Sequence, residues 1–177
     1  MDYKCLIYEV NESIATLTMN RPERLNALGD TLRTDLHDAM MTASGDPDVR
    51  AIILTGAGRG FCSGGDVKAM NEAKQRHESS PMMDKIAPSR DLTVLAMRDA
   101  PKPIIAAVNG PAVGVGITMA LPFDDAAALV AIRPDRPIGE VDLAPTIDLA
   151  RRVIFANRER LERTTTGDTR PGRRLWV

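Results

Sequence analysis

The stretch that decides the fold runs from Ala51 to Lys68 and reads AIILTGAGRGFCSGGDVK. Its opening residues are apolar and rich in isoleucine, which is typical of a buried strand in a parallel sheet. A glycine-rich turn follows, and Asp66 is suited to cap the helical pattern that begins there. Gly64 and Gly65 lack side chains, so the backbone can turn sharply and a ligand can approach closely. Backbone N–H groups at such a turn are suited to hold a developing oxyanion.

A second stretch, from Pro103 to Gly116, has the same character and reads PIIAAVNGPAVGVG. It again predicts a strand, a glycine-containing turn and the start of a helix. Two strand–turn–helix units of this kind can present two backbone N–H groups to one carbonyl oxygen.

The first half of the chain predicts a hairpin and a crossover helix. Strands are expected over 6–10 and 14–19, joined by a turn at 11–13. An amphipathic helix is expected from Leu28 to about Ser44, with Asp30 or Thr31 as its cap. The buried strand at 49–54 follows, and this β–α–β order predicts a parallel pair with a right-handed crossover.

The later elements are expected from the same patterns. The sequence predicts helices over 67–75, 82–98 with an interruption near Pro88, and 113–121, and a strand over 104–108. The helix at 113–121 is expected to be buried, because it has almost no charged positions.

Three motifs together carry a resemblance to a known family. They are RPERLNAL at Arg21–Leu28, GFCSGGDVK at Gly60–Lys68 and AVNGPAVGVG at Ala107–Gly116. In this order and at these separations the chain resembles the enoyl-CoA hydratase/isomerase (crotonase) superfamily over roughly Leu6 to Ala120. The resemblance implies an α/β fold with a ClpP/crotonase core of repeated ββα units, incomplete at the C-terminus.

The resemblance also implies a ligand and a site. Members of the family bind acyl-CoA thioesters, and two backbone N–H groups hold the thioester oxygen as it takes on enolate charge. The motif positions match Ser63 for the first donor and Val115 for the second. Ala27 is the expected ligand contact at the CoA entrance, and Arg24 or Lys68 is a candidate partner for a CoA phosphate. The implied substrate-binding set is Arg24, Ala27, Leu28, Ser63, Gly64, Gly65, Asp66, Val67, Gly114 and Val115.

Only one of the two acid–base positions of the family is matched by a carboxylate in this sequence. Classical hydratases of the family use two glutamates. The first position matches Thr118, which cannot act as a general base at neutral pH, and the second falls near Glu140. Glu140 is therefore the candidate acid–base residue, and isomerase-type members need only one carboxylate. Hydration and isomerisation both stay open. The alternative is a catalytically inactive fragment that at most binds CoA thioesters.

The chain changes character after about Leu121. Residues 121–177 hold ten Arg and no Lys, whereas residues 1–120 hold eight Arg and five Lys. We expect a crotonase-like core over 1–121 and an aberrant, partly disordered Arg-rich segment over 122–177. Because family members are much longer, the chain is expected to be truncated or frame-shifted beyond this point. The tail as an RNA-binding arm is disfavoured, since acidic residues are mixed with its arginines.

Composition excludes several classes of function. The net charge of −1 and an aromatic content of 3% argue against nucleic acid and an anionic membrane surface as partners. No secretory signal and no membrane span are apparent, so the cytoplasm is the expected location. The resemblance implies no metal or redox cofactor, with coenzyme A only as part of the substrate. Intact members form homotrimers or hexamers, largely through C-terminal elements that this chain is expected to lack.

The remaining candidates for chemistry are one cysteine, two histidines and a glycine-rich run. Cys62 could be a nucleophile, but no histidine lies near it in sequence, which favours a buried inert thiol. His37 and His77 are expected at the surface. The glycine-rich run at 56–60 lacks the Gly-Lys-Ser/Thr ending of a phosphate-binding loop, which argues against a nucleotide phosphate as its ligand.

Overall fold

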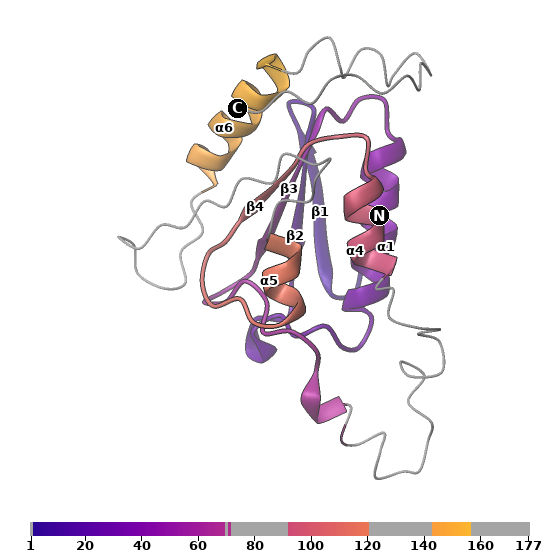
Figure 1. The fold of residues 1–177 in the computed structure, drawn as a ribbon, viewed down its shortest axis with the longest axis vertical. Helices are drawn as coiled ribbons and strands as arrows, with labels where there is room; N and C mark the ends of the chain where they lie inside the picture. The colour runs from indigo at the N-terminus through magenta and orange to yellow at the C-terminus, as the bar shows by residue number, and fades with distance from the viewer. Residues whose placement is uncertain (1, 70, 72–91, 121–142, 157–177) are drawn as a thin grey trace.

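A computed structural model describes residues 2–69, 71, 92–120 and 143–156. These residues form a mixed four-stranded sheet in the order β1-β2-β3-β4, with helices packed on both of its faces (Figure 1). The α/β class predicted from the sequence is confirmed.

A hairpin forms one edge of the sheet. β1 (Leu6–Asn11) pairs antiparallel with β2 (Ile14–Met19) through a two-residue turn. Glu12 and Ser13 in this turn have φ angles of 49° and 62°. Positive φ at both central residues gives the turn the twist that a tight hairpin requires. The predicted hairpin is confirmed.

The rest of the sheet is parallel. β2 pairs with β3 (Ala51–Gly56), and β3 pairs with β4 (Ile104–Ala107). α1 (Leu32–Gly45) connects β2 to β3, as the β–α–β pattern predicts. Every residue of β3 and β4 is buried, because helices cover the sheet on both sides.

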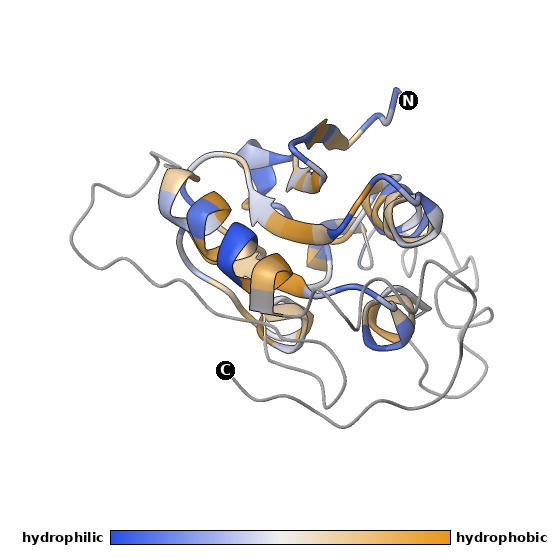
Figure 2. Cartoon of the chain, turned by 90° about the horizontal axis from the view of Figure 1, so that it is seen from above, coloured by the Kyte–Doolittle hydropathy of each residue, from blue (hydrophilic) through white to orange (hydrophobic). Residues whose placement is uncertain are grey.

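Alternate residues of the central strands serve two separate cores. Ile52 and Leu54 of β3 face the larger core, which is shared with α1, α4 (Leu92–Asp99) and α5 (Val115–Ala120). Ile53 and Ile105 face the smaller core beneath α6 (Ala144–Ala156). Seen from above, the apolar residues gather between the sheet and its helices (Figure 2).

α1 begins four residues later than predicted. Leu28 does not join the helix, because it forms an isolated parallel bridge with Gly65. Asp30 then takes a positive φ of 50°, which is incompatible with a right-handed helix. Thr31 occupies the N-cap position, but its hydroxyl donates to the Asp35 carboxylate rather than capping a backbone N–H.

α5 is buried on one face only, so the prediction of a buried helix holds for that face and not for the other. Met119 is 2% exposed and belongs to the larger core, whereas Ile117 is 46% exposed. The absence of charge misled the prediction, since no described element covers the outer face of this helix. α5 begins at Val115 rather than at residue 113, and β4 ends one residue earlier than expected.

α6 lies in a region to which the sequence patterns assigned no element. Ala150 and Val153 are buried against the sheet, and the helix packs on β3 and β4. The rest of the Arg-rich segment, at 121–142 and 157–177, lies outside the described residues. So do the helical predictions at 72–75 and 82–91, although residues 67–69 and 71 are helical as expected.

Candidate functional site

The middle motif lies between the other two. Cys62 forms a parallel bridge with Ala112, and the Val113 N–H donates to the Cys62 carbonyl at 2.9 Å. On the other side the Leu28 N–H donates to the Gly64 carbonyl at 2.7 Å. Segments that are far apart in sequence therefore run side by side, and the three motifs predicted to form the site do meet.

Two glycines allow this close approach of backbone to backbone. A Cβ on Gly64 would lie 2.9 Å from the Val113 carbonyl oxygen, and the residue has a φ of +91°. A Cβ on Gly116 would lie 2.3 Å from the Cys62 carbonyl oxygen. These positions exclude any side chain because the chain itself occupies the space, whether or not a ligand is bound.

The two predicted oxyanion donors differ in their hydrogen bonds. The Ser63 N–H donates to the Leu25 carbonyl at 2.9 Å, and the Ser63 hydroxyl donates to the Arg24 carbonyl at 3.2 Å. Val115 is the first residue of α5, and its N–H has no hydrogen-bond acceptor within the described residues. One donor is thus in use by the protein, whereas the other has no acceptor in the part of the chain that the structure describes.

The residues predicted at the CoA entrance split into buried and exposed groups. Leu28 is 2% exposed and packs in the larger core, so its side chain offers no surface to a ligand. Ala27 is 6% exposed, and its carbonyl accepts a hydrogen bond from Arg21. Arg24 and Val67 are exposed and remain accessible from solvent.

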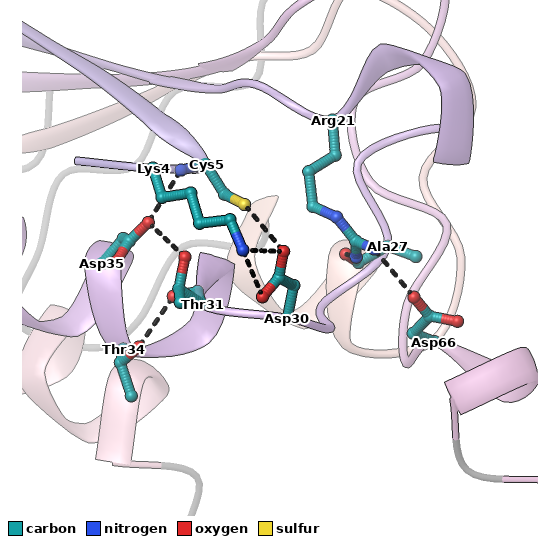
Figure 3. Close-up of polar contacts among 9 residues, drawn as sticks. All are labelled: Lys4, Cys5, Arg21, Ala27, Asp30, Thr31, Thr34, Asp35 and Asp66. Carbon is teal, nitrogen blue, oxygen red and sulfur yellow. Dashed lines mark hydrogen bonds and ion pairs between the residues drawn. The ribbon is translucent and has the colours of Figure 1, made fainter. Parts of the chain in front are cut away.

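A buried ion pair that the sequence did not predict joins the first two motifs. The Arg21 guanidinium donates to the Asp66 carboxylate at 3.0 Å and to the Ala27 carbonyl at 2.7 Å (Figure 3). Asp66 also accepts the Ala69 N–H at 3.1 Å, which confirms its predicted capping role. Burial alone would raise the pKa of Asp66, but the Ala69 hydrogen bond and the Arg21 charge outweigh it, and the pKa lies below its ordinary value.

A pair of asparagines also links the motifs, and the sequence did not single out either. Asn26 is completely buried, and its amide donates to the carbonyls of Ala57 and Gly60 at 3.0 and 2.8 Å. Asn109 donates to the carbonyl of Gly58 at 2.8 Å and to that of Gly60 at 3.4 Å. The amide side chains within the first and third motifs were the available signal.

No acid–base pair is present in the described part of the site. Thr118 is exposed, and its hydroxyl donates to the Val115 carbonyl at 2.8 Å within its own helix. Glu140 lies outside the described residues, so its role as the acid–base residue stays a prediction.

The cysteine and histidine predictions have mixed outcomes. Cys62 is fully buried and unpaired, and burial raises the pKa of its thiol, which confirms a buried thiol rather than an activated one. His37 is half-buried, with a buried Nδ1 that finds no partner among the described residues, so a plain surface position for it is wrong. His77 lies outside the described residues.

Two features are absent from the described residues, a cluster of metal-binding side chains and a membrane-spanning helix. Neither residues 2–69 and 71 nor the segments 92–120 and 143–156 contain a group of three or more His, Cys, Asp or Glu placed to hold a metal ion. Within the same ranges no helix combines the length and apolar character needed to cross a membrane.

Comparison with known proteins decides the family. A sequence profile described as enoyl-CoA hydratase/isomerase matches residues 9–129, which is more than half of the chain. The chain belongs to the enoyl-CoA hydratase/isomerase family. The resemblance carried by the three motifs is therefore confirmed, together with the crotonase fold that it implied.

Individual family members align with about two thirds of this chain or more, but with a smaller share of their own length. The 1,2-epoxyphenylacetyl-CoA isomerase of Escherichia coli K12 is 36% identical over 129 residues, covering 67% of this chain and 45% of that protein. A crystal structure of an enoyl-CoA hydratase/isomerase from Xanthobacter autotrophicus Py2 is 36% identical with a TM-score of 0.60, covering 73% of this chain and 49% of the other. An enoyl-CoA hydratase from Mycobacterium marinum also has a TM-score of 0.60, at 32% identity, with coverage of 72% and 57%. The chain thus spans a little under half the length of the curated relatives it matches.

Proposed function

We propose that this chain binds an acyl-CoA thioester with the carbonyl oxygen held by the backbone N–H groups of Ser63 and Val115. The observation that carries the proposal is the parallel bridge between Cys62 and Ala112, which brings the Ser63 turn beside the start of α5. The Val115 N–H, which has no acceptor among the described residues, is a suitable donor for a developing negative charge.

The chemistry follows from where charge develops. Removing a proton beside a thioester carbonyl, or adding water to the conjugated double bond, places negative charge on the thioester oxygen. Once binding has brought both N–H groups to the thioester oxygen, they stabilise that enolate without further reorganisation during the reaction. In this proposal Glu140 supplies the acid–base function, as a hydratase or isomerase of the family requires.

The hydrogen bond between Ser63 and Leu25 defines the change that binding requires. A thioester oxygen would replace the Leu25 carbonyl as acceptor of the Ser63 N–H, exchanging one hydrogen bond for another. Leu25 has a φ of 48°, a strained value for a side chain of its size. A shift of Leu25 toward relaxed backbone would offset part of the cost of releasing this donor.

A second candidate function is thioester binding without turnover. Thr118 favours it, because a hydroxyl that donates to its own helix cannot act as a general base. Under either candidate we propose a cytoplasmic location, supported by two cysteines that stay as free thiols.

The test uses a variant that removes one donor and leaves its neighbours. Val115→Pro deletes the N–H at the first helical position, where proline is tolerated, and Val115→Ala keeps that N–H. Calorimetry with butyryl-CoA would measure binding, and a crotonyl-CoA hydration assay would measure turnover. If V115A behaves like the parent chain and V115P loses about 100-fold or more in turnover, the oxyanion role is supported.

Two other results separate the candidates. Saturable binding without any turnover would select the thioester-binding role, and the thioester carbonyl stretch in the infrared would then replace turnover as the readout. Absence of binding by folded parent protein would overturn both candidates.

A further inference from the structure

One backbone carbonyl in the middle motif receives amide donors from both flanking motifs. The Gly60 carbonyl accepts the Nδ2 of Asn26 at 2.8 Å and the Nδ2 of Asn109 at 3.4 Å. Asn26 belongs to the first motif and Asn109 to the third. Gly60 lies three residues before Ser63, so its orientation determines how the Ser63 turn begins.

Asn26 also fixes the residues around it. Its Oδ1 accepts the backbone N–H of Arg21 at 2.8 Å, and its Nδ2 makes a second bond, to the Ala57 carbonyl at 3.0 Å. The side chain is completely buried, so water cannot replace these partners. All of its polar atoms are used to hold backbone, and none is needed to satisfy another side chain.

The same residue sits in a strained backbone. Leu25 and Asn26 have φ angles of 48° and 54°, both in the left-handed region. Asparagine tolerates this region better than leucine does, and such conformations persist only where surrounding structure holds them. The carbonyl of Leu25 is the acceptor that the Ser63 N–H uses. Asn26 therefore holds the start of the Ser63 turn. It also lies next to Leu25, whose carbonyl competes with a ligand for the Ser63 N–H.

We propose that Asn26 is a positioning residue that holds the backbone at the start of the Ser63 turn, so that the Ser63 N–H can reach the thioester oxygen once the Leu25 carbonyl has released it. The inference rests on the proposed function, and it adds a residue that acts through the backbone without touching the ligand. Asn109 supports the same carbonyl from the other side, with the Gly56 N–H donating to its Oδ1 at 3.3 Å.

The decisive variant is Asn26→Asp, which has the same shape and keeps an oxygen for the Arg21 N–H. It removes the two N–H donations, to Ala57 and Gly60. The probe is crotonyl-CoA labelled with carbon-13 at the thioester carbonyl, and the readout is the infrared stretch of the bound carbonyl. We expect N26D to lose most of the red shift seen with the parent chain, and any turnover to fall about 100-fold.

A matched control separates positioning from stability. Thr55 is 1% exposed, and its hydroxyl donates to the Ala107 carbonyl at 2.9 Å. Thr55→Val removes a buried hydrogen bond to a carbonyl without touching the turn, so it should lower stability and leave the bound carbonyl stretch unchanged. The spectrum reports only bound, folded protein, and a smaller folded fraction alone cannot move it.

The outcomes distinguish this inference from the proposed function. A bound N26D that keeps the full red shift overturns the positioning role. A parent chain that shows no saturable binding or no red shift overturns the proposed function instead. If N26D does not fold, Asn109→Asp removes only the donors to Gly58 and Gly60. This variant should show a partial loss of the shift, and full retention would overturn the inference.

Discussion

The Nη2 of Arg21 lies 3.0 Å from the Oδ2 of Asp66, a residue 45 positions later in the chain. The two side chains are only 12% and 10% exposed. The second terminal nitrogen of the same guanidinium, Nη1, donates to the Ala27 carbonyl, so one side chain joins the first motif to the second. The planar guanidinium suits this arrangement, because its two terminal nitrogens donate to two separate acceptors from fixed positions.

Loss of the Asp66 charge should destabilise the fold strongly. Asp66→Asn keeps an oxygen for the Ala69 N–H but leaves the Arg21 charge buried without its partner. The expected loss is about 3 kcal/mol in the free energy of unfolding, measured by urea denaturation. Asp30→Asn is the matched control, because its pair with Lys4 is exposed to solvent and should contribute far less to stability. Equal losses in the two variants would contradict this account.

The same carboxylate should make stability depend on acid pH. Its pKa in the folded chain is lower than the ordinary 3.8, because Ala69 and Arg21 outweigh the effect of burial. Asp66 therefore binds a proton more readily in the unfolded chain than in the folded one. Its contribution to the free energy of unfolding is fully present above pH 3.8 and is lost as the pH falls below that value. The difference in stability between the parent chain and D66N should narrow on acidification. A constant difference across that range would show that Asp66 does not titrate in this way.

Gly116→Ala should destabilise the junction of the second and third motifs. The new Cβ would lie 2.3 Å from the Cys62 carbonyl oxygen, so backbone must move to admit it. The expected loss is about 1–3 kcal/mol, typical of overpacking. Gly45→Ala provides the comparison, since nothing lies within 4 Å of the place where the new Cβ would stand, and alanine favours helix. Thermal unfolding of both variants would check the prediction, which fails if G116A matches G45A.

α6 offers a direct test of the smaller core. Val153 is 5% exposed against the sheet, whereas Phe155 on the same helix is 81% exposed. Val153→Asp should cost about 3 kcal/mol or more, because it places a charge among apolar side chains. Phe155→Asp should be close to neutral. Similar urea midpoints for the two variants would mean that α6 does not pack on the sheet as described.

Much of the sheet could be predicted because its cause lies within short stretches. The run from Ala51 to Leu54 is apolar without interruption, which indicates a strand covered on both faces. The start of α1 could not be predicted in the same way, since Leu28 is drawn into a bridge with Gly65 far along the chain. Periodicity alone does not contain that contact.

α6 was missed although its pattern is present. Ile147, Ala150 and Val153 recur at helical spacing, and all three pack in the smaller core. The prolines and the excess of arginine in the surrounding segment indicated an irregular chain instead of a helix. Pro145 in fact lies in the first turn of the helix, where proline is tolerated.

The motifs of the candidate site were predictable, but the contacts that hold them were not. Glycine spacing around Ser63 and Val115 indicated two turns that could meet, and these turns do lie together. The roles of Arg21 and Asn26 depend on partners tens of residues away. Those roles become visible only when the distances are known.

Cys62 provides an intrinsic reporter for this region. Its thiol is fully buried directly before Ser63, and its raised pKa keeps it in the unreactive protonated form at neutral pH. Alkylation of this sulfur therefore requires the turn to open, and its labelling rate measures the frequency of that opening. Cys5 is the other thiol in the chain, so mass spectrometry of the labelled peptides would follow the turn and the start of β1 separately.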